Sequence, residues 1–185
     1  MADVSAADRL HWDETYSSRG DVDPDAVRIP ADFAACEREF PTGGTALDIA
    51  CGSGAAAVWL ARRGLEVTGI DISEVALGKA RELAEHWEVS DRCRFAAVDL
   101  DGGLPPGPPV DVIVCHRFRV PELYGSIAGR LKPGGLLAVS VLSEVGAHAG
   151  RYRARPGELA AAFTGVDTIA TGEGNGIAWL LARKT

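Results

Sequence analysis

The sequence has no long hydrophobic run. No apolar stretch approaches the roughly 20 residues that a membrane-spanning helix needs. The N-terminal segment MADVSAADRLHWDETYSSRG also lacks the basic and apolar regions of a secretory signal peptide. We therefore expect a cytoplasmic protein with no membrane partner.

Cysteines are few and form no recognisable metal or redox motif. The four are Cys36, Cys51, Cys93 and Cys115, and they include no C-x-x-C pair and no histidine at zinc-binding spacing. Three of them fall in or beside apolar stretches. We expect reduced, mostly buried thiols and no metal site.

Positive charge is in deficit, with 19 Lys and Arg against 26 Asp and Glu and a net charge of −7. Such a chain lacks a general surface for polyanions, so we expect no nucleic-acid partner. Segment 117–155 is the exception, because its local balance is +5. Its basic residues are Arg117, Arg119, Arg130, Lys132, Arg151, Arg153 and Arg155.

Length and composition favour a single globular domain. The chain has 185 residues, of which 46% are hydrophobic and 24% are charged, which is enough to build one core. We predict one domain over 1–185, with an N-terminal helical lid or substrate segment at 1–43 and a cofactor-binding core at 44–185.

Short apolar runs alternate with helical patterns along the core. They predict strands at 45–50, 65–70, 93–98, 110–115 and 135–142 and helices at 54–63, 73–87, 120–131 and 156–163. Ser73 is a good N-cap, and KPGG at 132–135 ends a helix before the next strand. The C-terminal residues predict two strands joined by a Gly-rich turn at 172–176. The pattern indicates an α/β, doubly wound, mostly parallel sheet that ends in an antiparallel hairpin.

Residues 45–64, TALDIACGSGAAAVWLARRG, predict a strand, a glycine turn and a helix, which is a nucleotide-binding arrangement. Gly52, Gly54 and Ala57 fit the dinucleotide fingerprint G-x-G-x-x-G/A, and Asp71 follows at about the expected ~20-residue distance. An NAD-dependent oxidoreductase is therefore one interpretation.

Three carboxylates point to a different ligand. Asp48, Asp71 and Asp99 fall at the ends of three successive predicted strands, where open parallel sheets bind ligands. A carboxylate beneath the turn opposes a pyrophosphate there. S-adenosylmethionine has no phosphate, and its sulfonium, ammonium, ribose diol and adenine amino group all suit carboxylates.

Five motifs in order resemble those of class I S-adenosylmethionine-dependent methyltransferases: ALDIACGSG, VTGIDIS, FAAVDLD, VDVIVCHRF and LKPGGLLAVSV. The family usually shows D-x-G-x-G-x-G, whereas here Ala50 replaces the first glycine and Cys51 keeps a common cysteine. The resemblance implies the Rossmann-like methyltransferase fold with a seven-stranded sheet.

The same resemblance implies site residues. Asp48 and the backbone at Ala50, Cys51, Gly52 and Gly54 would hold the methionine part of S-adenosylmethionine. Asp71 would bind the ribose hydroxyls, and Ile72, Asp99 and Leu100 would contact the adenine. Cys115 would also lie near the cofactor. The product would be S-adenosylhomocysteine. Asp48 and Asp99 have an alternative interpretation as structural caps.

The chain's ends resemble a narrower group, the small tellurite-resistance and thiopurine-type methyltransferases, through HWDETYSSRG and RYRARPGELAAAF. The "RPL"-like segment of that group appears here as VPEL at 120–123. The likeness implies that Trp12 and Tyr16 belong to a lid near the cofactor. Burial of an amphipathic helix on the sheet is the alternative for both residues.

Acceptor motifs are mostly missing. The residues after the fourth predicted strand are CHRF rather than [DN]-P-P-[YF], and no Pro-Cys dipeptide occurs. Asn175 is the chain's only asparagine, which excludes the Asp-Asp-Asn metal site of catechol-type enzymes. We expect a small acceptor, anionic or of thiol or chalcogen type. Candidate catalytic residues are His116, as a base, and Arg117; candidate substrate-binding residues are Arg119, His148, Arg151 and Arg153.

For these arginines, a solvated loop is the alternative interpretation. An S-adenosylmethionine-binding protein without transfer activity is a second possible function. The sequence does not indicate an oligomeric state.

Overall fold

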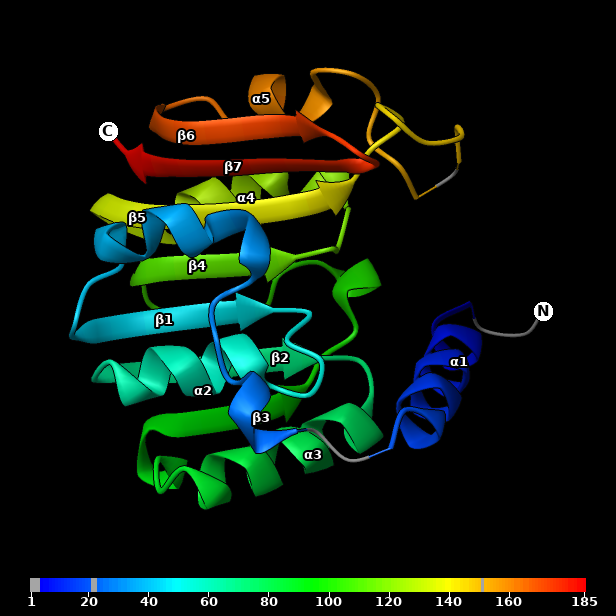
Figure 1. Cartoon of the computed structure of the whole chain (residues 1–185), viewed down its shortest axis with the longest axis vertical. Helices are drawn as coiled ribbons and strands as arrows, with labels where there is room; N and C mark the ends of the chain where they lie inside the picture. Colours follow the sequence, from blue (N-terminus) through cyan, green and yellow to red (C-terminus); the bar gives the residue numbers. More distant parts are fainter. Residues whose placement is uncertain (1–3, 21–22, 151) are drawn as a thin grey trace. The chain divides into compact units, whose positions relative to one another are not determined.

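A computed structural model describes residues 4–20, 23–150 and 152–185 of the chain. The strands follow the order β3-β2-β1-β4-β5-β7-β6 (Figure 1). Pairs β1–β2, β2–β3 and β4–β5 are parallel, and pairs β5–β7 and β6–β7 are antiparallel. This confirms the predicted α/β fold with a mostly parallel seven-stranded sheet and a C-terminal antiparallel hairpin.

The elements alternate in the way that the apolar runs predict. The strands are β1 (Gly44–Ile49), β2 (Leu65–Asp71), β3 (Cys93–Ala97), β4 (Val110–His116), β5 (Leu131–Leu142), β6 (Val166–Gly174) and β7 (Ile177–Lys184). The α-helices are α1 (Val4–Ser18), α2 (Ala55–Arg62), α3 (Glu74–His86), α4 (Tyr124–Arg130) and α5 (Glu158–Ala162). Short 3₁₀ helices are η1 (Pro24–Ala26), η2 (Ala31–Glu39), η3 (Ser90–Arg92), η4 (Leu100–Gly102) and η5 (Pro121–Leu123).

The chain divides into two compact units. The first contains residues 1–29 and 41–105, and the second contains residues 30–40 and 106–185. The N-terminal segment before β1 is thus shared between the units, since α1 belongs to the first and η2 to the second. The predicted boundary between a lid at 1–43 and a core at 44–185 stays a prediction.

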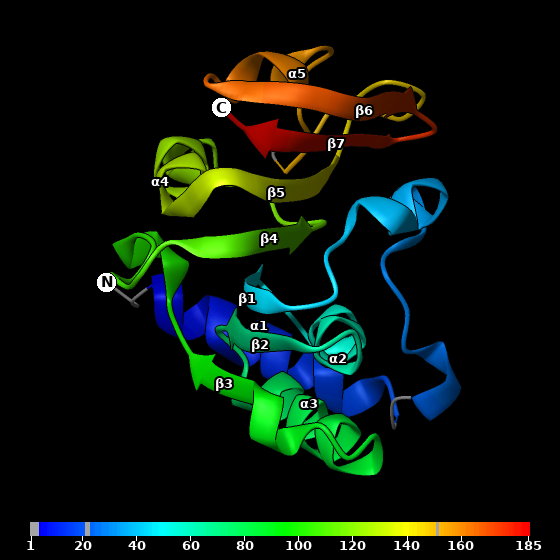
Figure 2. The same cartoon turned by 90° about the vertical axis from the view of Figure 1, so that its left-hand side faces the viewer.

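In the first unit, β1, β2 and β3 carry α2 and α3, and α1 lies against α3 (Figure 2). The mostly apolar helix α2 buries Val58 and Leu60 completely, as expected for a helix that covers a parallel sheet. Helix α3 begins at the predicted N-cap, because the Ser73 hydroxyl accepts a hydrogen bond from the Ala76 N–H at 3.1 Å.

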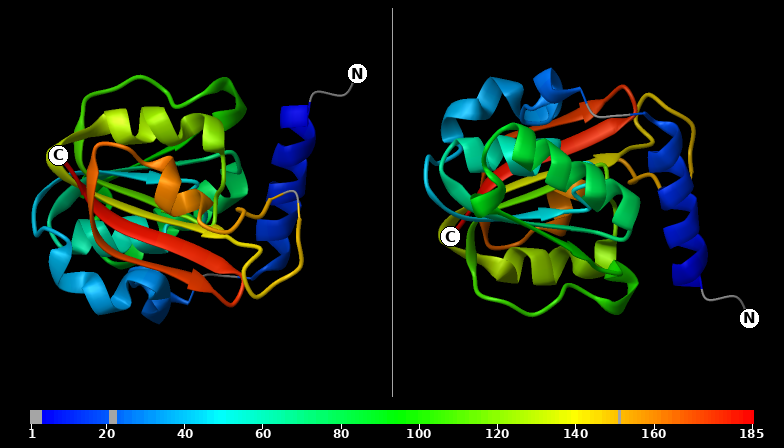
Figure 3. Two further views of the ribbon diagram at one scale, coloured as in Figure 1. Left: turned by 90° about the horizontal axis from the view of Figure 1, so that it is seen from above. Right: turned by 90° about the horizontal axis from the view of Figure 1, so that it is seen from below.

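In the second unit, β6 and β7 form a hairpin alongside β5 (Figure 3). The core contains the fully buried side chains of Ile113, Leu137 and Leu181. Segment η2 is fixed here by Phe33, which is fully buried and meets the Trp179 ring edge-on at 6.0 Å between centroids.

Two predicted boundaries were wrong. Strand β5 begins at Leu131 rather than at residue 135, so KPGG lies inside the strand; the irregular register opposite β4 accommodates it. The hairpin turn contains Asn175 and Gly176 alone rather than 172–176, and both have positive φ, 51° and 79°. That pair of angles is typical of the tight two-residue turn that Asn-Gly favours.

The cysteines are more exposed than predicted. All four are free; Cys115 is buried, whereas Cys36, Cys51 and Cys93 are partly exposed. Within the described ranges, none of the helices combines the length and the apolar character that a membrane crossing requires.

Candidate functional site

The turn after β1 is a left-handed glycine turn that ends at helix α2. Ala50, Gly52 and Gly54 have φ of 54°, 52° and 80°. The turn is closed by a hydrogen bond from the Gly54 N–H to the Cys51 carbonyl at 3.0 Å. A second bond, from the Cys51 N–H to the Ile70 carbonyl at 3.0 Å, fastens it to β2. Glycine adopts such angles freely, but alanine does so at a cost.

Asp71, the last residue of β2, fixes this turn from the other side. Its Oδ2 accepts a hydrogen bond from the Gly52 N–H at 2.8 Å, and its Oδ1 accepts one from the Ser73 N–H at 2.9 Å. The carboxylate therefore joins the glycine turn to the start of α3. Burial raises the pKa of Asp71, and the three N–H groups of Ser73, Gly52 and Ile72 oppose that rise.

Asp48 is an almost fully buried carboxyl beneath the turn, with 2% of its surface exposed. Its Oδ2 is buried and has no hydrogen-bond partner among the described residues. Burial, and then the neighbouring charge of Asp71, raise the pKa of Asp48 to about 8, and the Ala57 N–H partly opposes this. A buried acceptor without a donor is costly, so a cationic ligand donor fits this position.

Helix α1 is fixed on α3 at two points. The Asp13 Oδ1 accepts hydrogen bonds from the Ser73 hydroxyl at 2.6 Å and the Val75 N–H at 3.3 Å. Near the other end, the Lys79 ammonium donates to the Tyr16 carbonyl at 2.7 Å and to the Gly20 carbonyl. Asp13 stands in the segment HWDETYSSRG, but the sequence predicted no function for Asp13 or for Lys79.

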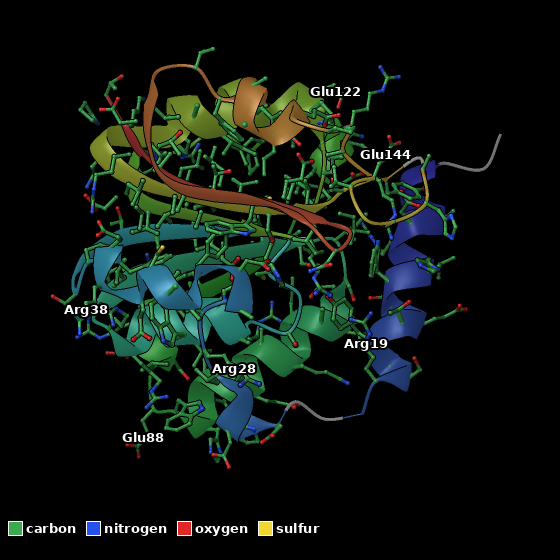
Figure 4. All side chains as sticks on the ribbon, turned by 45° about the horizontal axis from the view of Figure 1, so that its top comes forward. Arg19, Arg28, Arg38, Glu88, Glu122 and Glu144 are labelled. Carbon is green, nitrogen blue, oxygen red and sulfur yellow. The ribbon has the colours of Figure 1, made fainter. Side chains whose placement is uncertain are left out.

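These contacts place Tyr16 directly over the glycine turn. A Cβ at Gly52 would overlap the Tyr16 hydroxyl. Burial, and then the Asp71 charge, raise the pKa of Tyr16 to about 12, whereas Arg19 opposes the rise. Arg19, labelled in Figure 4, lies 5.2 Å from the centre of the Tyr16 ring. Trp12 is 39% exposed and meets the Tyr16 ring at 6.1 Å between centroids.

The predicted adenine-binding residues follow β2 and β3. Ile72 is half-buried, and Leu100 is buried. Asp99 accepts a hydrogen bond from the Asp101 N–H at 3.0 Å and thus caps η4, which is the structural contact that its alternative interpretation expects. Contact of these three residues with adenine stays a prediction.

The candidate catalytic residues of the second unit lie at the end of β4. Cys115 is buried and His116 half-buried. Arg117 has a left-handed φ of 57°, and its N–H donates to the Ser140 carbonyl at 2.8 Å. The His116 Nε2 lies 3.5 Å from the Asp32 Oδ2. Asp32 was missed, because no local pattern connects two residues so far apart in the sequence.

The basic residues of segment 117–155 are largely engaged within the second unit. Arg119 forms a two-point ion pair with Glu158, at 2.7 and 2.8 Å. Arg153 donates from Nη1 to the carbonyls of Ser143 and Gly176, at 2.8 and 3.2 Å. His148 is exposed, and Arg151 lies outside the described residues.

These contacts give Arg119 and Arg153 structural functions. Substrate binding by the four predicted residues stays a prediction. In the described part of the chain, no group of three or more His, Cys, Asp or Glu side chains is placed to hold a metal ion.

A family model described as "Methyltransferase domain" matches residues 46–135. Among curated relatives, the chain is 32% identical over 148 residues to the ubiquinone biosynthesis O-methyltransferase of Alkalilimnicola ehrlichii. The match covers 77% of this chain and 59% of that protein. It is 36% identical over 105 residues to the ribosomal protein L11 methyltransferase of Tolumonas auensis, covering 55% and 35%. The chain thus spans less than two thirds of the length of these relatives.

Solved structures show the same fold. TehB from Haemophilus influenzae superposes with a TM-score of 0.71 at 20% identity, covering 96% of this chain and 67% of that one. Magnesium protoporphyrin IX methyltransferase from Synechocystis PCC 6803, with bound SAH, gives a TM-score of 0.70 at 18% identity, covering 99% and 100%.

Proposed function

We propose that the chain, whose residues 46–135 match a methyltransferase-domain model, transfers a methyl group from S-adenosylmethionine to a small-molecule acceptor. The observation that carries the proposal is the buried Asp48 Oδ2 beneath the glycine turn, which lacks a donor among the described residues. An ammonium there would donate to Oδ2 and favour the ionised carboxylate, whereas a pyrophosphate would add negative charge beside Asp48 and Asp71.

S-adenosylmethionine, when bound, supplies a methyl group activated by its sulfonium. Asp48 pairs with the ammonium of the methionine part, while Gly52 and Gly54 let the backbone approach it closely. The Asp71 carboxylate has about four acceptor sites. It accepts bonds from the Gly52 and Ser73 N–H groups and can accept a further bond from a ribose hydroxyl. Tyr16 covers the turn and excludes water from it.

Three further residues, Ile72, Asp99 and Leu100, hold the adenine. Cys115 completes the set of residues assigned to the cofactor, and Trp12 extends the cover that Tyr16 provides.

Transfer itself is an in-line displacement, so the protein contributes mainly proximity and orientation. His116 takes a proton from the acceptor where one must leave. Arg117, with His148 and Arg151, favours an anionic or chalcogen-type acceptor. Arg119 and Arg153 would join them only by giving up their bonds to Glu158 and to backbone carbonyls. The relatives differ in acceptor, since one is named for ubiquinone biosynthesis and another for a ribosomal protein. The acceptor class is therefore proposed from this chain's own residues and not from its relatives.

A titration with S-adenosylmethionine, S-adenosylhomocysteine and NAD tests the cofactor. We expect saturable binding of the first two and none of NAD. Binding of NAD alone would support the oxidoreductase interpretation and overturn the proposal.

Transfer of labelled methyl groups to a panel of thiols, phenols, amines, carboxylates and chalcogen oxyanions tests the activity. Asp48→Asn is the control, and we expect it to weaken binding of S-adenosylmethionine. Saturable binding of S-adenosylmethionine with no labelled product across the panel would favour a binding protein without transfer activity.

A further inference from the structure

His116 has an acidic partner that comes from a distant part of the chain. The Asp32 Oδ2 lies 3.5 Å from the His116 Nε2, with 21% of the Asp32 side chain and 34% of the His116 side chain exposed. That Oδ2 is buried and accepts no hydrogen bond from any described residue. Contacts between catalytic groups shorten when the reacting complex forms.

Packing and hydrogen bonds hold the segments that carry both partners. Asp32 precedes Phe33, whose buried ring packs on Trp179. At the far end of η2, the Arg183 Nη2 donates to the Glu39 carbonyl at 3.2 Å and to its Oε2 at 3.1 Å. The residues that follow Asp32 in η2 are therefore anchored at both Phe33 and Glu39.

His116 is fixed by β4 and by the turn that follows. It pairs with Ser140 of β5 in the parallel register, and the next residue donates its N–H to the Ser140 carbonyl. The imidazole therefore leaves the strand end in a defined direction, which a positioned base requires.

We propose that Asp32 is a positioning residue that orients His116 as a general base, and that the acceptor is consequently a hydroxyl or thiol compound that loses a proton during transfer. This inference rests on the proposed function and deepens it. With Nε2–H directed at Asp32, Nδ1 is the basic nitrogen that can accept a proton.

The step balances in atoms and charge. As the acceptor oxygen or sulfur forms its bond to the methyl carbon, its proton passes to Nδ1 of His116. The bond between the methyl carbon and the sulfonium sulfur breaks, and its electron pair stays on sulfur, giving S-adenosylhomocysteine. The Asp32 carboxylate then compensates the charge of the imidazolium.

The protonation of His116 agrees with this assignment. Burial lowers the pKa of His116 below its ordinary value of 6.5, and the Arg117 charge lowers it further, while Asp32 opposes both. The imidazole is therefore neutral near pH 7 and able to accept a proton. Asp32 and Arg117 are the charged groups that act on it among the described residues.

The first test needs no cofactor. NMR titration of the His116 imidazole in the wild-type protein and in Asp32→Asn should show a lower pKa in the variant, because the stabilising carboxylate charge is lost. Asp111→Asn is the matched control, since Asp111 lies on the same strand and pairs with Lys132 instead. An unchanged His116 pKa in Asp32→Asn would overturn the inference.

The second test measures transfer. For phenol or thiol acceptors, we expect His116→Gln to lower kcat by roughly 10²–10⁴-fold and Asp32→Asn to lower it by a smaller factor, with S-adenosylmethionine affinity unchanged. The loss should shrink at high pH, where the acceptor ionises unaided. Asp32→Glu should restore part of the rate, and Asp111→Asn should not reduce it.

The outcomes separate the two proposals. Wild-type protein that methylates no acceptor overturns the proposed function. Wild-type protein that methylates only thioethers or tertiary amines, which have no proton to lose, leaves the proposed function standing and overturns this inference. Equal rate losses in Asp32→Asn for acceptors with and without a proton also overturn it.

Discussion

At the scale of single residues, the most unusual group is the Asp48 carboxyl. It is buried, and its pKa is raised to about 8 by desolvation and by the charge of Asp71. The folded chain therefore holds this proton more tightly than the unfolded chain. The stabilising contribution is complete below the ordinary carboxyl pKa of 3.8 and is lost as the pH rises towards about 8.

Asp48→Asn should flatten this dependence. We expect the free energy of unfolding of the wild-type protein to fall more between pH 4 and pH 8 than that of the variant, because the asparagine cannot ionise. Urea unfolding at a series of pH values measures the free energy of unfolding of both proteins. Asp167→Asn, at an exposed position in β6, is the control. Parallel curves for the wild type and Asp48→Asn would contradict the prediction.

Ala50 is a second residue whose conformation lowers the stability of the folded chain. Its left-handed φ of 54° is unfavourable for alanine by about 1–2 kcal/mol, whereas glycine adds about 0.4–1 kcal/mol of chain entropy to the unfolded state. Ala50→Gly should therefore raise stability by up to about 1.5 kcal/mol. Thermal or urea unfolding measures the difference.

The same chemical change in a helix gives the control. Ala56→Gly lies inside α2 and should destabilise the fold by about 1 kcal/mol. Loss of stability in both variants would show that the strain assigned to Ala50 is absent.

At the scale of elements, helix α1 depends on a few polar contacts rather than on burial. Leu10 and Trp12 are exposed, at 64% and 39%, while Asp13 and Lys79 attach the helix to α3. The position of Tyr16 over the glycine turn consequently depends on Asp13, a contact that the sequence pattern of α1 did not reveal.

Asp13→Ala should loosen α1. We expect a loss of about 1 kcal/mol in helix attachment, faster proteolysis within α1 and weaker S-adenosylmethionine binding, because Tyr16 no longer covers the turn. Limited proteolysis and a binding titration measure these. Glu14→Ala, at the exposed neighbouring position, should change neither. Full protection of α1 in Asp13→Ala would show that the contact is dispensable.

At the scale of the whole molecule, a ligand that binds only the folded chain stabilises it by mass action. At a hundred times its dissociation constant the gain is about 2.7 kcal/mol, which for a chain of this size is about 5–10 °C in Tm. We expect this rise with S-adenosylmethionine and S-adenosylhomocysteine in differential scanning calorimetry. NAD at the same concentration is the control, and an equal rise with NAD would contradict the carboxylate argument.

The sequence by itself determined the alternation of strands and helices and the positions of Asp48 and Asp71, because apolar periodicity and glycine turns are local properties. It also placed the start of α3 at Ser73. It misplaced the start of β5, because a Pro-Gly-Gly sequence usually ends regular structure, whereas here an irregular register accommodates it.

Only the tertiary structure decided which distant groups meet. Asp13 reaches Ser73, Asp32 reaches His116, and Glu158 engages Arg119. Such pairs depend on how elements pack, and no spacing along the chain encodes them. The buried Asp48 acceptor and the strained Ala50 are likewise consequences of packing, since solvation and φ are set by the folded surroundings rather than by residue type.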